Sequence, residues 1–169
     1  LVPYGYANIW ISTFHAFGDR ILRDNALELG MVPDFKVLSS PEQIIFFKEH
    51  LFQFSLNHYR PLGNPTKFIE AMIKLFSRAK DEDIFPDEYL SYIERLEKEF
   101  ARNSEDEELK EILWKQNEIA LAYKRYQELL TQEGKIDFGD QVYIALNLLR
   151  KSKNILKTYQ NKFKYILVD

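Results

Sequence analysis

Apolar residues recur at intervals of three and four along most of this chain, which is the spacing of an amphipathic helix. The longest such run, residues 109–134, predicts one helix of about 25 residues, or roughly 38 Å. Glycine, proline and capping residues separate the runs. The spacing predicts helices over residues 13–30, 40–54, 65–79, 86–100, 109–134, 138–150 and 155–163.

Two of these helices begin with a capping signal. Ser40-Pro41-Glu42-Gln43 combines an N-cap serine, a proline at the first helical position and a glutamine that can close a capping box. Asp137 stands where the N-cap of the next-to-last helix is expected, with Phe138 as its core anchor. We therefore expect Ser40 and Asp137 to set the start of their helices.

Three short segments depart from helical spacing and are rich in β-branched or aromatic residues. Residues 8–12 and 164–169 are expected to be buried strands, and residues 35–38 a short extended piece. The fold class expected is mainly α, with a helical insertion flanked by short strands of a parallel α/β core. Because a strand is stable only when paired, we expect a piece of a longer protein whose end strands are free to pair with each other or with a second copy.

Composition narrows the classes of function. With 169 residues and 46% apolar positions, the chain has enough material for one domain. Its formal net charge of -3 shows no overall basic excess, so a nucleic-acid partner must be inferred from local charge. The absence of cysteine excludes disulfides, thiolate metal sites and cysteine nucleophiles, and fits a cytoplasmic location. No apolar stretch approaches the roughly 18 residues of a membrane span.

Thr13-Phe14-His15 stands at the junction of a predicted strand and a predicted helix. Ligands of open α/β sheets bind at the carboxyl ends of strands. A hydroxyl and an imidazole at a helix N-terminus can meet a phosphate, and the Phe14 ring can stack on a base. The same residues also fit a plain N-cap, a core phenylalanine and a first-turn histidine.

Three segments together resemble one protein family. Residues 9–17 and the following Arg-Ile-Leu-Arg at 20–23 closely resemble motif Ib of the UvrD/Rep (PcrA-like) superfamily 1 DNA helicases. Residues 134–140 are similar to the Asp-Phe-x-x-Leu segment of that family, although glutamine and valine stand where a leucine pair is more usual. Residues 163–169 are similar to the strand that ends in the Walker B carboxylates. The three segments have the order and spacing of the family.

The resemblance implies a domain layout. Residues 1–30 would belong to a RecA-like ATPase core, residues 31–133 to the helical subdomain 1B, and residues 134–169 to the core again. Asp169 would be the catalytic acid that holds Mg²⁺ at ATP. The chain contains no Gly-x-x-x-x-Gly-Lys-Ser/Thr phosphate loop. We therefore expect ATP and Mg²⁺ in the longer protein, and no bound cofactor or activity in this piece alone.

In the family, motif Ib contacts the backbone of the tracked single strand, and subdomain 1B lies near the junction of duplex and single strand. A basic helix face in the insertion is then the best local site for phosphate contacts, although an ordinary solvated face fits the same residues. The acidic residues 105–108 should lie away from DNA. The implied DNA-contacting residues are Thr13, Phe14, His15, Lys67, Lys74, Arg78 and Lys80.

The function expected is part of a cytoplasmic ATP-dependent DNA helicase that tracks single-stranded DNA and unwinds duplex DNA in repair or replication. Its partners would be single-stranded DNA, fork DNA and the rest of the helicase chain, with no membrane. Two alternatives stay open: a helicase-nuclease subunit of the AddA/RecB type, and a helical protein-interaction domain that binds neither DNA nor nucleotide.

Overall fold

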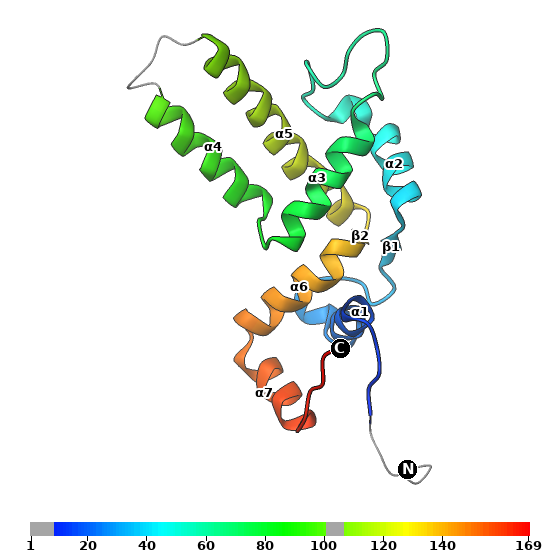
Figure 1. Cartoon of the computed structure of the whole chain (residues 1–169). Coiled ribbons are helices and arrows are strands. Elements are labelled where there is room, and N and C mark those ends of the chain that lie inside the picture. Colours follow the sequence, from blue (N-terminus) through cyan, green and yellow to red (C-terminus); the bar gives the residue numbers. More distant parts are fainter. Residues whose placement is uncertain (1–8, 101–106) are drawn as a thin grey trace.

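The computed structural model describes residues 9–100 and 107–169, most of which lie in helices (Figure 1). The helices predicted from hydrophobic spacing are present, although the first two end early and continue as 3₁₀ turns. The mainly α fold class is confirmed. In chain order the elements are α1 (Phe14–Asp24), η1 (Ala26–Leu29), β1 (Lys36–Leu38), α2 (Ser40–Glu49), η2 (Leu51–Gln53), α3 (Ile69–Asp81), α4 (Pro86–Phe100), α5 (Glu107–Gln132), β2 (Lys135–Asp137), α6 (Phe138–Lys151) and α7 (Lys153–Lys162).

The two end segments expected to be strands are not strands. Residues 9–12 and 164–169 have no regular secondary structure, and Asn8 lies outside the described residues. Most of their apolar side chains are exposed, with Ile11 at 93% and Leu167 at 97% of full accessibility, whereas Trp10 is partly buried against Phe17 and Phe163. A strand needs a neighbour to complete its backbone hydrogen bonds, and the described part of the chain pairs neither segment.

A small parallel sheet occurs where the sequence predicted no sheet. β1 pairs with β2 in the register Lys36 to Lys135 and Leu38 to Asp137. The extended character of β1 was predicted, but the three residues of β2 are too few for their alternation to be recognised. The chain between the two strands includes α2 to α5, so the β1–β2 pair brings together the two ends of this helical segment (Figure 1).

Two hydrophobic cores lie on either side of this sheet. The first holds α2, α3 and α5 together through aromatic side chains such as Phe47, Phe76 and Tyr126, each at most 1% exposed. The second unites α1, α6 and α7 through residues such as Leu22 and Ile155. Figure 1 shows α2 to α5 at one end of the molecule and α1, α6 and α7 at the other. We call α2 to α5 the helical module.

The cap of α2 differs by one residue from the prediction. Ser39, not Ser40, is the N-cap, and Glu42 rather than Gln43 closes the capping box. The Glu42 carboxylate accepts hydrogen bonds from the Ser39 backbone N–H at 2.9 Å and the Ser39 hydroxyl at 2.7 Å. Either of the two adjacent serines could begin the helix. Lys36 lies 2.7 Å from Glu42 and pairs with the carboxylate that caps Ser39, which favours Ser39 as the N-cap.

A buried ion pair network joins the two halves of the fold. Lys80 Nζ, from α3, lies 2.7 Å from Asp137 Oδ2 and 2.8 Å from Asp140 Oδ1, at the start of α6. The side chains of Lys80 and Asp140 are fully buried, and that of Asp137 is 4% exposed. Gln127, from α5, donates a hydrogen bond to Asp140 Oδ1 at 3.1 Å. Two helices of the helical module therefore contact the first turn of α6 through polar groups.

The charge state of this network follows from its contacts. Burial lowers the pKa of the Lys80 ammonium, but the two carboxylates outweigh that effect and raise the pKa above its usual value. Burial also raises the pKa of the Asp140 carboxyl, although Lys80 opposes the shift. Asp137 and Asp140 also accept each other's backbone N–H at 3.0 Å, which confirms the predicted Asp137 cap.

Replacing Lys80 with methionine should destabilise the protein by about 3–5 kcal/mol, because it leaves two buried carboxylates without a cation. Lys74→Met is the matched control: Lys74 is 73% exposed and should change stability by no more than about 0.5 kcal/mol. Urea unfolding followed by circular dichroism measures both. Equal effects of the two substitutions would contradict a structural role for the buried network.

Glu42→Gln should alter the pH dependence of stability between about pH 4.5 and pH 2. Hydrogen bonds from Lys36 and Ser39 lower the pKa of Glu42 from 4.5 to about 2. A depressed carboxyl pKa stabilises the fold above the unfolded value, and that contribution is lost as the pH falls through the folded value. The stability difference between wild type and Glu42→Gln, from urea unfolding at several pH values, should therefore shrink toward pH 2. Glu49→Gln, an exposed carboxylate, should show no such trend.

Candidate nucleic-acid interface

Thr13-Phe14-His15 forms the start of α1. The Thr13 hydroxyl accepts a hydrogen bond from the Ala16 backbone N–H at 3.2 Å, so Thr13 is the N-cap. The Phe14 side chain is 65% exposed and is not part of the core. No acidic residue lies in the first turn of α1. The free N–H groups and the helix dipole at this end therefore favour an anion such as a phosphate.

His15 lies against the first residue of α6. The ring centroids of His15 and Phe138 are 5.5 Å apart, in an edge-to-face arrangement. Phe138 is 50% exposed, so the prediction that it anchors the core is wrong. The buried face of α6 is instead formed by Gly139, Gln141 and residues farther along the helix. Two segments that are far apart in the sequence thus present their aromatic rings at one place.

The placement of α1 on α6 is fixed by a close backbone contact. A Cβ atom at Gly18 would collide with the carbonyl oxygen of Gln141, so only glycine lets the two helices approach this closely. The Gln141 side chain donates a hydrogen bond to Asp19 Oδ1 at 3.1 Å. Because His15 meets Phe138 and Gly18 meets Gln141, the first turns of the two helices pack against each other.

The arginines of the Arg-Ile-Leu-Arg stretch hold α1 in place. Arg23 donates hydrogen bonds to the carbonyl of Pro33 at 2.8 Å and to that of Phe35 at 3.4 Å. The Arg20 guanidinium lies 3.5 Å from the centroid of the Trp10 ring, a cation–π contact. Both side chains therefore attach α1 to neighbouring segments of the chain.

The basic face predicted on the helical module has three exposed members, not four. Lys67, Lys74 and Arg78 are exposed. Lys74 pairs with Glu70 at 2.7 Å, whereas Arg78 forms no ion pair within the described part of the chain. The expectation that Lys80 shares this face is wrong, since its side chain is buried. The buried face of α3 explains why: its members, at helical spacing, are Ile69, Met72, Ile73, Phe76 and Lys80.

The structure does not gather the predicted DNA-contacting residues into one cluster. Thr13, Phe14 and His15 belong to the half of the fold that contains α6 and α7. Lys67, Lys74 and Arg78 lie just before or on α3, in the helical module (Figure 1). An interface that uses both groups must extend along the molecule, as a strand of nucleic acid would.

Asp169 is exposed. No group of three or more metal-binding side chains occurs among the described residues. Mg²⁺ at a nucleotide is held by one or two carboxylates together with phosphates and waters. A single exposed carboxylate is too few ligands for such a site, and the role expected of Asp169 stays a prediction.

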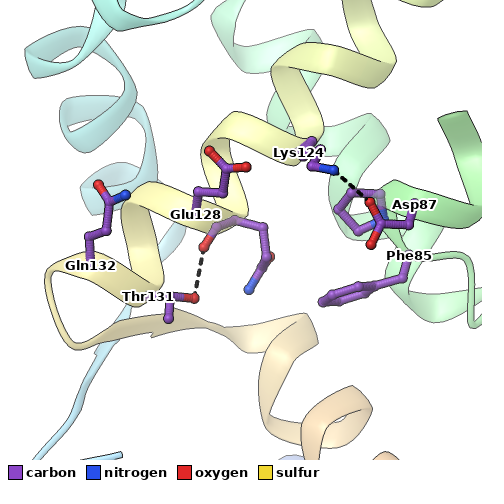
Figure 2. Close-up of a pocket in the computed structure, with 8 residues that line it drawn as sticks. Phe85, Asp87, Lys124, Glu128, Thr131 and Gln132 are labelled. Atoms are coloured by element: carbon purple, nitrogen blue, oxygen red, sulfur yellow. Dashed lines mark hydrogen bonds and ion pairs between the residues drawn. The ribbon is translucent and has the colours of Figure 1, made fainter.

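A cavity of about 340 Å³ lies between α4 and α5 (Figure 2). An ion pair between Lys124 and Asp87, 2.9 Å long, crosses its edge. Thr131 donates to the Gln127 carbonyl at 2.9 Å on the opposite side. None of the residues predicted from the sequence to bind DNA or nucleotide lines this cavity.

Other predicted features have partial outcomes. The sequence also has a basic stretch at residues 150–164, which fits either phosphate contacts or a solvent-facing segment. Arg150 pairs with Asp83 at 2.7 Å and Lys162 lies 4.1 Å from the Trp10 ring centroid, so these two cations are engaged within the fold. Glu105 lies outside the described residues, and Glu107 begins α5. In residues 9–100 and 107–169, no helix has both the length and the apolar character that crossing a membrane requires.

The chain resembles known helicases over nearly its whole length. The profile of the UvrD/REP helicase N-terminal domain matches residues 4–169. The chain is 27% identical to DNA helicase II of Haemophilus influenzae over 161 residues, which is 95% of this chain and 19% of that protein. It is 29% identical to the ATP-dependent DNA helicase PcrA of Staphylococcus epidermidis over 161 residues, with the same coverage of 95% and 19%. For PcrA of Leuconostoc citreum the identity is 26% over 164 residues, or 96% of this chain and 18% of that protein.

The chain spans about a fifth of the length of these relatives. The profile match includes the start of α1, the whole helical module and the segment that ends at Asp169. The resemblance of the three sequence motifs is therefore confirmed: this chain belongs to the UvrD/REP helicase N-terminal domain family.

Proposed function

We propose that this chain is part of an ATP-dependent DNA helicase and provides a contact surface for single-stranded DNA. The observation that carries the proposal is the start of α1, where Thr13, Phe14 and His15 lie at a helix N-terminus that has no acidic residue in its first turn. The exposed Phe14 ring and the unpaired N–H groups offer stacking and phosphate contacts at the same place. Family membership supports DNA as the ligand.

The two hydrophobic cores support a domain layout, although Phe35 of the central segment belongs to the core of α1, α6 and α7. We assign residues 1–30 and 134–169 to a RecA-like ATPase core and residues 31–133 to a helical subdomain 1B. The shared core of α1, α6 and α7 supports the first assignment, because these elements come from both ends of the chain. The separate core of α2, α3 and α5 supports the second. The parallel β1–β2 pair lies at the boundary between them.

Each group of predicted residues has a defined part in this proposal. The hydroxyl of Thr13 and the imidazole of His15 contact the sugar-phosphate backbone of the single strand, and Phe14 contacts a base. Lys67, Lys74 and Arg78 neutralise phosphates near the duplex junction. Asp169 is one ligand of Mg²⁺ in the longer protein, where bound ATP supplies the free energy for movement along DNA. Repair or replication is the proposed setting.

Binding of labelled DNA across a salt series tests this proposal. Fluorescence anisotropy of the 169-residue chain with single-stranded and fork DNA should show affinity that falls as salt rises. Changing Lys67, Lys74 and Arg78 together to glutamine should reduce the magnitude of the salt slope by about 2, since each phosphate contact contributes roughly 0.7 to 0.9. His15→Ala should weaken single-strand binding by about tenfold, the loss of one charge-assisted hydrogen bond.

The matched control removes three exposed cations elsewhere. Lys98, Lys110 and Lys124, on α4 and α5, are changed to glutamine, which alters net charge equally. If the salt slope is unchanged in this control and reduced in the first triple variant, the phosphate contacts are made by Lys67, Lys74 and Arg78. Folded protein that binds neither DNA at low salt would reject the proposal and favour a helical protein-interaction domain.

A further inference from the structure

We propose that the exposed face of α7 binds the phosphate backbone of duplex DNA through Lys151, Lys153 and Lys157, which we call the α7 lysines. The inference rests on the proposed function, because it takes DNA as the ligand, and it adds a contact surface to that function. α7 follows α6 and lies at the other end of the fold from the helical module (Figure 1). The α7 lysines are therefore separate from the exposed cations on or just before α3.

The part of the sequence that contains α7 carries positive charge only. Residues 141–168 include six lysines and arginines and no aspartate or glutamate. Two of the six cations are engaged within the fold, Arg150 with a carboxylate and Lys162 with an aromatic ring. The α7 lysines form no ion pair or hydrogen bond with any residue that the structure describes. Their charge is thus available to a partner.

The helix presents its cations on the side that faces solvent. Ile155 and Tyr159 are buried in the core that α7 shares with α1 and α6. Lys153 and Lys157 are four residues apart, so their side chains are neighbours on the exposed side. The exposed residues around them include three neutral amides that can donate hydrogen bonds, namely Asn154, Gln160 and Asn161. The face therefore combines cations with hydrogen-bond donors and has no carboxylate of its own.

The free chain holds these lysines in an unfavourable arrangement. Lys153 is the first residue of α7, where the helix dipole favours an anion over a cation. Lys153 and Lys157 also repel each other, because like charges four residues apart destabilise a helix. On α3 and α5, in contrast, Lys74 and Lys115 each pair with a glutamate four residues earlier, at 2.7 and 2.5 Å. A phosphate bound between the α7 lysines would offset both unfavourable interactions.

The chemistry of the face favours a duplex over other anionic partners. None of the exposed side chains of α7 is aromatic or apolar. Proteins that bind single strands stack bases on aromatic rings, and protein interfaces have an apolar or aromatic centre. A duplex presents phosphates outward, and these are contacted by lysine, amide side chains and helix N-termini. The α7 face supplies these groups.

Binding of a duplex across a salt series tests the inference. A labelled blunt duplex and labelled oligothymidylate are titrated into the 169-residue chain and into the Lys151→Gln/Lys153→Gln/Lys157→Gln variant. The variant should reduce the magnitude of the salt slope for the duplex by between about 2 and 3, since each phosphate contact contributes roughly 0.9. The slope for oligothymidylate should not change. The Lys98, Lys110 and Lys124 variant is the matched control and should leave both slopes unchanged.

Stability measurements separate a binding role from a structural one. Urea unfolding of the α7 variant without DNA should give a stability equal to or greater than that of wild type, because the substitutions remove repulsion. The duplex should raise the midpoint of unfolding of wild type more than that of the variant. A clear loss of stability in the DNA-free variant would show that the lysines serve the fold and would overturn the inference.

Crosslinking tests whether the face touches the duplex directly. The chain contains no cysteine, so a single introduced thiol can carry a photocrosslinker. Asn161→Cys places the crosslinker one helical turn after Lys157, and Glu94→Cys places it on an exposed position of α4 as the control. The Asn161 position should crosslink to the blunt duplex, and added salt should abolish the product. Equal yields at the two positions would overturn a specific contact.

The outcomes distinguish this inference from the proposed function. Wild type that binds oligothymidylate in a His15-dependent way, with a duplex slope that ignores the α7 lysines, overturns the inference and leaves the proposed function intact. Duplex binding through the α7 lysines without binding of oligothymidylate supports the inference and overturns the contact at α1. Labelled polyglutamate is titrated in parallel: if the α7 variant weakens its binding but not that of the duplex, the face binds an acidic polypeptide and the inference is wrong.

Discussion

The buried contact between Lys80 and the two aspartates at the start of α6 is the constraint on which the arrangement of this fold depends. Removing three charges from water is costly, and only short, well-directed contacts offset that cost. An ammonium that has two carboxylate partners at 2.7 and 2.8 Å cannot shift without leaving a charge unpaired. The contact therefore fixes where the helical module meets the half of the fold that contains α1, α6 and α7.

Asp137 combines three structural roles at this point. It is the last residue of β2, the N-cap of α6 and a partner of Lys80. The parallel pairing of β2 with β1 and the position of α6 are thus set by one residue. Because Gly18 lets α1 approach α6 closely, the same residue indirectly sets where His15 and Phe138 meet. The candidate DNA surface is therefore coupled to the packing of the helical module.

The proposed interface has two parts with different physical character. The start of α1 offers a helix N-terminus, a histidine and exposed rings, which suit close contact with a single strand. The second part consists of three long, exposed cations on or just before α3, namely Lys67, Lys74 and Arg78. Such cations suit longer-range attraction of phosphates, and this attraction weakens as salt rises. Under the proposed function DNA is the common ligand of both parts, and the division between them fits a substrate that has both single-stranded and duplex regions.

The sequence by itself determined the helices, the Asp137 cap and the family, because helical spacing, capping residues and short motifs are local signals. The sequence did not reveal that the Lys80 side chain is buried, although the spacing of Lys80 from Phe76 and Met72 placed this residue on the buried face of α3. It also could not decide the fate of the two end segments, the β1–β2 pairing or the exposure of Phe138. Each of these depends on residues distant in the chain: a strand needs a partner, a buried charge needs a counter-charge, and a ring at a helix start is buried only if something packs on it.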